Sequence, residues 1–354
     1  MNILIIGSGV IGLSTAFELS LRGHKVRVLT RNYEEGASWV AGGMLAPFSE
    51  GLEGNLLDFS LESLRLYPDF VERLEEVSKI KLFYNRNGIL RLSLTEEEHK
   101  EIKENAERYR NMGIELEEIP TEELEKREPN ISREIFGGVL FREEGNVDAE
   151  KLMDALIFAC ESLGIKILID DITEIERSGE SVECIKGYRD TYRADFYVFA
   201  TGAWSKSLLK VPVYPVKGQI LKVKGLELEK VYYSSISYII PKENHVLIGA
   251  TSEDAGFDSR TTLSGINRLI EGAVRVIPAL SEAELLSVKV GFRPGTPDEM
   301  PIFDFGENFA ILTGHYRNGI LWAPASASLA LDLIENGSIS RYFELFSPKR
   351  FVKK

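Results

Sequence analysis

The sequence predicts an α/β fold with α+β insertions, in which a Rossmann-like domain is interleaved with a domain built on an antiparallel sheet. Three observations favour this class. A strand, a helix and a second strand are complete within about the first thirty residues. From Lys81 the pattern changes to short alternating strands, and residues 211–248 are again rich in strand-like runs. This order predicts two domains threaded through one another.

The N-terminal segment begins with Asn2 to Ile6, a continuous apolar run typical of a strand that is buried on both faces of a parallel sheet. A helix is expected to begin within GSGVIG and to end before Gly23, and KVRVLT is expected to form the next strand. The segment EEGASWVAGGMLAPF that follows is unusually rich in glycine and apolar residues for an exposed loop.

The remaining elements follow from periodicity and turn signals. Residues 82–94 predict two strands joined by a turn at residues 86–88, and the last predicted helix begins near Ile320. The other helices are expected at residues 56–74, 96–112, 121–129, 149–164 and 263–277, and the other strands at GGVLF, IKILID, ITEIER, ADFYVFA, LLSVKVGFRPG and ILTG. We therefore place the Rossmann-like domain in residues 1–80, 146–212 and 290–354, and the antiparallel domain in residues 81–145 and 213–289.

Composition excludes several classes of protein. The 354 residues are 44% hydrophobic and 27% charged, as in ordinary soluble globular proteins. A net charge of -13 argues against a nucleic-acid partner, and no apolar run has the length needed to cross a membrane. The N-terminus is a strand without a basic leader, so a cytoplasmic location is expected. Cys160 and Cys184 are isolated, which predicts neither a disulfide framework nor a metal site.

The turn after the first strand carries the glycine pattern of a dinucleotide-binding site. Gly7, Gly9 and Gly12 form G-x-G-x-x-G between a strand and a helix. The first glycine allows the tight turn, the second lets a pyrophosphate approach the backbone, and the third packs the helix on the strand. The helix N-terminus, at Val10 and Ile11, offers N–H groups and a partial positive charge to a diphosphate. The motif in this setting predicts dinucleotide binding.

The second strand lacks the acidic residue that usually follows it and binds the ribose hydroxyls. The chain has Thr30 and Arg31 at this point. A threonine hydroxyl can form a hydrogen bond but brings no charge. Arg31 is compatible with a clamp on an NADP phosphate, or with an adenosine held by the backbone and by packing of Arg31. The sequence leaves both open.

A second strand end also predicts a close cofactor approach. The run FYVFATGAWS places Ala200, Thr201 and Gly202 at the end of a strand, followed by Trp204. Three small residues in a row predict that this backbone passes close to a bound molecule. Two such strand ends, far apart in the sequence, favour an extended cofactor, FAD rather than NAD.

Several segments together resemble the D-amino-acid oxidase superfamily of FAD-dependent amine oxidoreductases, and most closely its glycine oxidase branch, which serves thiamine biosynthesis. They occur in the family's order from Gly7 to Pro324, and GHYRNGILWAP with GFRPGTPDEMP is the most specific part. The others are GSGVIG, GASWVAGGMLAP, NVDAEKL, ATGAWS, PVKGQ, YIIP and LIGAT.

This resemblance implies a site that holds the carboxylate of an amino acid. Arg293 matches the family's carboxylate-binding arginine, whose planar fork binds both oxygens and stays charged. Arg317 is implied to line the substrate side as a second cation. Tyr238 matches the tyrosine that helps to hold the carboxylate or closes the site. Tyr232 and Tyr233 are weaker candidates of the same kind.

The resemblance also implies which residues surround FAD. The segment His315 to Leu321 is implied to wrap the flavin ring, with the following helix aimed at the edge where negative charge develops. Neither cysteine lies in a segment like the covalent attachment site of the sarcosine oxidase branch, so non-covalent FAD and no metal are expected. The expected cofactor contacts are Gly7, Gly9, Val10, Ile11, Gly12, Thr30, Arg31, Ala37, Ser38, Ala41, Gly42, Gly43, Met44, Ile172, Thr201, Gly202, Trp204, His315, Tyr316, Arg317, Asn318, Gly319, Ile320 and Leu321.

The implied reaction is oxidative deamination of glycine, or of a similar small amino acid, to the imino acid and then glyoxylate. A hydride passes from Cα to flavin N5, molecular oxygen takes the electrons and forms peroxide, and the product supplies thiamine thiazole biosynthesis. The sequence shows no obvious general base, and direct hydride loss from a neutral amine requires none. Two alternatives stay open: a dye-linked FAD dehydrogenase for L-proline or a D-amino acid, and an FAD-holding subunit of a larger complex. A homo-oligomer is expected.

Overall fold

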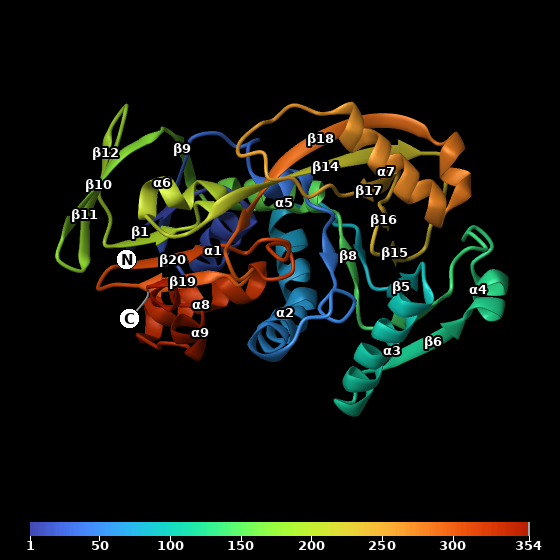
Figure 1. Ribbon diagram of the computed structural model, residues 1–354. Coiled ribbons are helices and arrows are strands. Elements are labelled where there is room, and N and C mark those ends of the chain that lie inside the picture. The colour runs from blue at the N-terminus through green and yellow to red at the C-terminus, as the bar shows by residue number, and fades with distance from the viewer. Residues whose placement is uncertain (353–354) are drawn as a thin grey trace.

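The computed structural model describes residues 1–352, and a six-stranded sheet organises one half of the molecule (Figure 1). Five of its strands run parallel, and β19 pairs antiparallel with β20 at one edge. The carboxyl ends of the parallel strands therefore lie at one edge of the sheet, where doubly wound folds bind ligands. The strand order is β19 (Ile302–Phe305), β20 (Phe309–Thr313), β13 (Phe196–Phe199), β1 (Asn2–Ile6), β2 (Lys25–Thr30) and β9 (Lys166–Ile169).

The two faces of this sheet are covered by different structures, because successive residues of a strand point to opposite sides. Ile3 and Ile5 of β1 pack in a core with α1 (Val10–Leu21), α2 (Gly54–Ser78), α5 (Ala149–Ser162) and α8 (Ala323–Asn336). Leu4 and Ile6 pack toward the small sheet of β10 (Ile172–Ser178), β11 (Ser181–Gly187) and β12 (Thr191–Tyr192). Burial on both faces explains the continuous apolar run of β1.

An eight-stranded, mainly antiparallel sheet organises the other half. Helix α7 (Leu263–Val276) packs on its outer face. Its inner face carries Ile220, Ile240 and Leu247, with Tyr233 and Tyr238 beside them. The strand order is β18 (Glu284–Gly295), β14 (Tyr214–Lys224), β17 (Val246–Gly249), β16 (Tyr238–Pro241), β15 (Val231–Tyr233), β5 (Ile89–Ser93), β7 (Gly137–Phe141) and β6 (Leu116–Pro120).

The turn at residues 86–88 joins two strands as predicted, but these strands belong to different sheets. β4 (Tyr84–Asn85) pairs with β8 (Gly145–Val147), which also pairs with β3 (Met44–Leu45). β5 instead pairs with β7 and β15. The Asn85 side chain accepts from the Asn87 N–H and donates to the Glu229 carbonyl, at 2.8 Å each, and so redirects the chain between the sheets.

The last long helix begins at Ala323 rather than near Ile320. Residues 319–322 form turns instead, in which Trp322 N donates to Asn318 O at 2.8 Å. Pro324 lies in the first helical turn, where proline is well tolerated because its N–H would have no helical partner. The remaining helices are α3 (Glu96–Asn111), α4 (Thr121–Arg127), α6 (Ser205–Leu209), α9 (Arg341–Leu345) and the short 3-10 helices at Ala37–Val40, Gly202–Trp204, Pro278–Glu282 and Pro348–Phe351.

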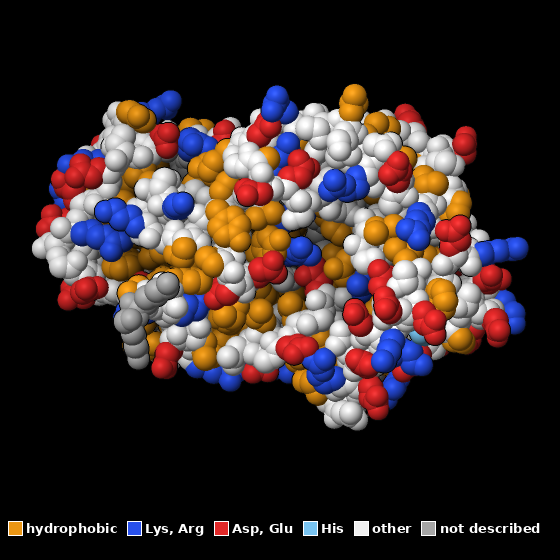
Figure 2. Space-filling model, in the orientation of Figure 1, with side chains coloured by type: hydrophobic (Ala, Val, Ile, Leu, Met, Phe, Trp, Pro, Cys, Tyr) orange, Lys and Arg blue, Asp and Glu red, His pale blue; other side chains and the backbone are white. Residues whose placement is uncertain are grey.

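The predicted fold class is confirmed, with a sheet-and-helix half and an antiparallel half (Figure 1). The domain limits stay a prediction, and the limit at residue 290 falls within β18. On the face shown in Figure 2, apolar side chains gather across the hollowed middle of the molecule. Within residues 1–352, none of the helices combines the length and apolar character needed to cross a bilayer.

A buried carboxyl group fixes the segment that follows β3. Glu144 has no solvent exposure. Its Oε1 accepts from Phe48 N at 2.5 Å and from Ser49 N at 2.9 Å, and the Ser49 hydroxyl donates to Oε2. Side-chain capping of two backbone N–H groups keeps this turn in one conformation.

We expect Glu144 to make the stability of the fold depend on pH. Burial raises its pKa to about 8. Between about pH 4.5 and 8 the folded state keeps a proton that the unfolded chain has lost, so the free energy of unfolding falls as pH rises. We expect Glu144→Gln to remove this dependence, worth roughly 2–4 kcal/mol at pH 8.

Thermal unfolding of wild type and Glu144→Gln at a series of pH values measures this effect. Glu53→Gln is a suitable control because Glu53 is exposed on the same segment and pairs with Arg108 at the surface. A difference in Tm between wild type and Glu144→Gln that stays constant from pH 5 to 8 would contradict the expectation.

Candidate active site

A cavity of about 610 Å³ lies at the carboxyl edge of the six-stranded sheet and extends to the inner face of the eight-stranded sheet. The chain reaches it from strand ends that are distant in sequence, as expected for a ligand site in a parallel sheet. Most of the predicted site residues line it: Gly7, Gly9, Val10, Ile11, Thr30, Arg31, Ala37, Ser38, Ala41, Gly42, Gly43, Met44, Ile172, Thr201, Gly202, Trp204, Tyr238, Arg293, His315, Tyr316, Arg317, Gly319 and Ile320.

The structure does not bring three predicted residues to this cavity. A Cβ at Gly12 would lie 2.0 Å from Gly7 O, so this glycine serves the packing of α1 on the turn. Leu321 is fully buried, and its carbonyl accepts from the Ser63 hydroxyl at 2.6 Å. Asn318 lines a smaller adjoining cavity of about 150 Å³.

The glycine turn and the ATG segment lie against one another. Gly7 has a φ of 114°, and a Cβ there would lie 2.2 Å from the carbonyl oxygen of Ala200. Ala200 N donates to Ile6 O at 2.8 Å, which fixes this approach. This close approach of the two backbones therefore requires glycine at position 7, and Thr201 and Gly202 line the cavity beside it.

The first helical N–H group of α1 already has a partner. Val10 N donates to the Ser38 hydroxyl at 2.9 Å, and Ser38 is buried. Ser38 therefore ties the 37–44 loop to the start of α1. The sequence predicts Ser38 beside a flavin or phosphate. In the structure this side chain also holds the loop against the start of α1.

Thr30, the last residue of β2, and Arg31 after it both make contacts within the protein. The Thr30 hydroxyl accepts from the Ser8 hydroxyl at 2.8 Å and donates to Asn32 O at 3.1 Å. Arg31 pairs with Glu35, and its guanidinium lies over the Trp204 ring at 5.2 Å. This arrangement favours packing of Arg31 over a phosphate clamp.

Glu35, which pairs with Arg31, places a carboxylate at the cavity wall close to the end of β2. It lines the cavity near Arg31 and Trp204. The residues at the strand end do not reveal this acid, because the loop brings it in five positions after Thr30.

The inner face of the eight-stranded sheet brings Arg293 and Tyr238 together. Arg293, on β18, donates from Nη1 to Thr251 O at 3.1 Å. Burial raises the pKa of the Tyr238 hydroxyl, and the Arg293 guanidinium opposes this shift. Two glycines make room for these side chains. A Cβ would lie 2.5 Å from Arg293 Nη1 at Gly218, and 2.2 Å from the Tyr238 ring at Gly249.

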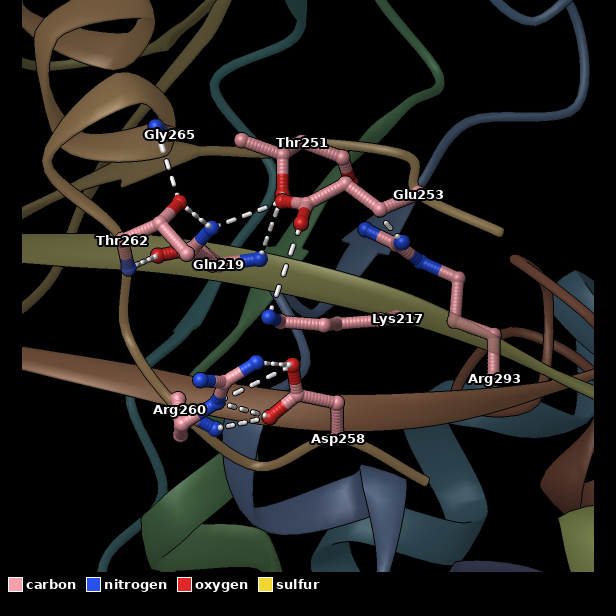
Figure 3. A network of polar contacts seen from close by, with 9 residues as sticks. All are labelled: Lys217, Gln219, Thr251, Glu253, Asp258, Arg260, Thr262, Gly265 and Arg293. Carbon is pink, nitrogen blue, oxygen red and sulfur yellow. Dashed lines mark hydrogen bonds and ion pairs between the residues drawn. The ribbon is translucent and has the colours of Figure 1, made fainter. Parts of the chain in front are cut away.

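A buried polar network fixes the partner of Arg293 (Figure 3). Thr251 Oγ1 accepts from Gln219 N at 2.8 Å and donates to Glu253 Oε1 at 2.5 Å. Gln219, which is fully buried, also donates from Nε2 to Glu253 Oε1 at 2.7 Å. Lys217 Nζ, 1% exposed, lies 3.5 Å from Glu253 Oε2. These contacts hold Thr251, and through its carbonyl the guanidinium of Arg293, in one place.

We expect Gly218→Ala to disturb the site while leaving the fold intact. The new methyl group would displace the guanidinium of Arg293, which is the mobile end of a long side chain. Misplacing a substrate anchor by about 1 Å costs on the order of 10- to 100-fold in rate or affinity. Steady-state kinetics together with thermal unfolding would test this expectation. An unchanged KM, or a large loss of Tm, would contradict it.

The polar segment before α8 divides between the cavity and the core. His315 lines the cavity, and its ring bonds Ser326 Oγ at 3.0 Å and packs near Phe303 and Trp322. Burial lowers the pKa of His315 to about 3, so the ring is neutral. Arg317 is exposed, and its guanidinium lies over the Tyr316 ring at 5.1 Å.

The two weaker tyrosine candidates, Tyr232 and Tyr233, lie on opposite faces of the sheet. Tyr233 lines the cavity, whereas the Tyr232 hydroxyl donates to Glu128 Oε2 at 2.6 Å on the opposite face of the sheet. Adjacent strand residues alternate between faces, so only one of them could reach the site.

Glu50 lines both the main and the smaller cavity, although the sequence did not predict it as a site residue. Burial raises the pKa of its carboxyl, and the guanidinium groups of Arg317, Arg293 and Arg91 oppose that shift. Glu50 lies three residues after Pro47 and directly after Ser49 in a turn, and nothing in this local pattern distinguishes it from a surface glutamate.

Comparisons with known proteins find a family and relatives that this chain resembles over nearly its whole length. The model of the DAO family, described as FAD dependent oxidoreductase, matches residues 2–333. The bifunctional protein ThiO/ThiG of Synechocystis is 35% identical over 99% of this chain and 54% of its own length. The chain thus spans about half the length of that relative. Glycine oxidase of Geobacillus kaustophilus is 32% identical over 100% of this chain and 98% of its own length.

A solved structure shows the same architecture. The crystal structure of glycine oxidase from Geobacillus kaustophilus superposes with a TM-score of 0.94 and 30% identity, and covers 99% of both chains. The fold described here is therefore that of a known oxidoreductase.

Proposed function

Since this chain belongs to the DAO family of FAD-dependent oxidoreductases, we propose that it oxidises glycine, or a similarly small amino acid, to the corresponding imino acid. The observation that carries the proposal is the placing of Arg293 and Tyr238 in the same cavity as the glycine turn of α1. A carboxylate anchor beside a dinucleotide site is what oxidation of an amino acid at Cα requires.

The described residues fit FAD. The turn at Gly7 has no room for a side chain, and the N-terminus of α1 lies at the cavity. A Cβ at Gly43 would lie 2.0 Å from Val147 O, and the buried Lys242 donates to Gly42 O at 2.8 Å, so the 42–44 loop is held as bare backbone. Within residues 1–352, neither Cys160 nor Cys184 lines the cavity. This supports non-covalent binding of FAD.

When bound, FAD supplies an acceptor for the hydride that leaves Cα. Arg293 would bind both carboxylate oxygens of the substrate through its planar fork. The raised pKa of Tyr238 keeps its hydroxyl protonated as a hydrogen-bond donor. Arg317 adds a second cation on the open side. Together these residues fix the direction of the Cα–H bond, which is the main contribution that the protein makes.

An aerobic assay with glycine tests the proposal. We expect peroxide, glyoxylate and ammonia in equal amounts from the FAD-loaded protein. Turnover with an artificial electron acceptor but not with oxygen would favour a dehydrogenase. Stable FAD binding with no turnover of any amino acid would favour a subunit whose role is to hold FAD.

The proposal extends to the use of the product and to assembly. The resemblance to the thiamine branch and the similarity to ThiO/ThiG support a product that feeds thiamine thiazole biosynthesis. We further propose molecular oxygen as the electron acceptor and a homo-oligomer as the working state.

A further inference from the structure

We propose that Glu50 binds the ammonium group of the substrate and accepts its proton, which makes it a further catalytic residue. This inference rests on the proposed function, because it assigns the amine end of an amino acid whose carboxylate is anchored at Arg293.

The position of Glu50 suits an ammonium group. It lines the main cavity together with Arg293, Arg317 and Tyr238. The other carboxylates that line this cavity among residues 1–352 are Glu35, Asp170 and Asp171, which follow β2 and β9 at the edge of the six-stranded sheet. Glu50 is thus the acid on the substrate side. An amino acid is a zwitterion in water, so a site built only from arginines would leave its positive end without a partner.

The backbone that carries Glu50 is preorganised. Glu50 N donates to Ala46 O at 3.1 Å. The two preceding residues are fixed through their N–H groups by the buried Glu144 carboxyl. A base that is held in place before the substrate binds loses little conformational entropy when it acts.

The surroundings of Glu50 keep its carboxyl group accessible from the cavity and able to accept a proton. Its carboxyl is half-buried, which raises its pKa, while nearby guanidinium groups and the Asn318 amide hold the ionised form. The Arg91 guanidinium lies over the Tyr233 ring at 4.4 Å, and its Nη1 is buried without a partner. The charged and titratable groups that face Glu50 are Arg91, Arg293, Arg317, Tyr233, Tyr238 and Glu144.

The proton transfer completes the chemistry of the site. The ammonium N–H bond breaks, the proton moves to a carboxylate oxygen of Glu50, and the amine keeps the electron pair. The neutral amine then loses a hydride from Cα, two electrons leave with it, and the nitrogen electron pair forms the C=N bond of the iminium product. FAD, when bound as in the proposed function, would supply the acceptor for this hydride.

The first test measures binding without turnover. The probes are 2-aminoisobutyrate and 2-hydroxyisobutyrate, which share a shape, lack a hydrogen at Cα and differ in the ammonium group. Titrations followed by the visible spectrum of bound FAD should show that wild type prefers the amino compound. Glu50→Gln should lose this preference by about 10-fold or more, because a hydrogen bond to a charged group is worth about 1.5–3 kcal/mol. Glu53→Gln, an exposed change on the same segment, should behave as wild type.

The second test is the pH dependence of anaerobic flavin reduction by saturating glycine. General-base catalysis contributes about 10²–10⁴-fold, so Glu50→Gln should slow reduction at pH 7 by about 100-fold. Its rate should then recover with rising pH, as the ammonium group of free glycine loses its proton to the solvent. Equal slowing at every pH, or no slowing, would overturn the role as a base.

The two tests separate the two claims. If wild type is not reduced by glycine, the proposed substrate is wrong, and the binding comparison still decides the role of Glu50. If wild type binds the hydroxy compound as well as the amino compound, or if Glu50→Gln keeps the preference, the inference is overturned even when glycine is oxidised.

Discussion

Arg293→Ala should raise the glycine concentration needed for half-maximal turnover by about 100-fold or more, because two charge-assisted hydrogen bonds of roughly 1.5–3 kcal/mol each are lost. FAD affinity should not change, because this side chain is anchored on the eight-stranded sheet through Thr251, away from the glycine turn. Arg293→Lys should recover only part of the loss, since an ammonium group cannot bind both carboxylate oxygens in the same plane.

Initial-rate kinetics and an FAD titration together measure this effect. Arg260→Ala is the matched control, because Arg260 pairs with Asp258 close to the same network and is exposed (Figure 3). A KM within a few-fold of wild type for Arg293→Ala would show that the carboxylate is anchored elsewhere, with Arg317 as the first candidate.

Gly7→Ala should abolish FAD binding at micromolar concentrations. The new Cβ would lie 2.2 Å from the oxygen and 2.8 Å from the carbon of the Ala200 carbonyl, which is backbone fixed by the pairing of β1 with β13. A φ of 114° adds strain for any side chain. The turn would have to move to relieve this contact. We therefore expect FAD to bind at least about 100-fold more weakly, a loss of roughly 3 kcal/mol in binding free energy.

Gly23→Ala is the control for Gly7→Ala. Gly23 also has a positive φ, of 84°, but a Cβ there would meet nothing within 4 Å. It should cost about 1 kcal/mol in stability and leave FAD binding unchanged. Fluorescence titration of the apoprotein with FAD, with Tm as the check on folding, compares the two. Tight FAD binding by Gly7→Ala would show that the cofactor does not depend on this turn.

The features that the sequence predicted well are those whose causes are local. The glycine turn, the buried strand β1 and the strand end at Thr201 each follow from a few neighbouring residues and a known backbone requirement. The start of α8 was misplaced by three residues because the turns at residues 319–322 are apolar and resemble a helix in pattern.

The features that were not predicted from the sequence depend on contacts between segments that are distant along the chain. Gly218 matters because β14 pairs with β18, which places the Arg293 guanidinium over it. Glu50 becomes a site residue only because Glu144, nearly a hundred residues later, binds the turn before it. The alternation of strand residues, by contrast, was available in the sequence and would have separated Tyr233 from Tyr232.

Anaerobic reduction of the bound flavin is the most direct test of the central claim that this cavity oxidises a small amino acid. The purified FAD-loaded protein is mixed separately with glycine, sarcosine, D-alanine and L-proline, and loss of the yellow colour is followed. We expect glycine to bleach the flavin rapidly. Bleaching by L-proline or D-alanine alone would keep the chemistry and change the substrate. A flavin that stays oxidised with all four would contradict the account.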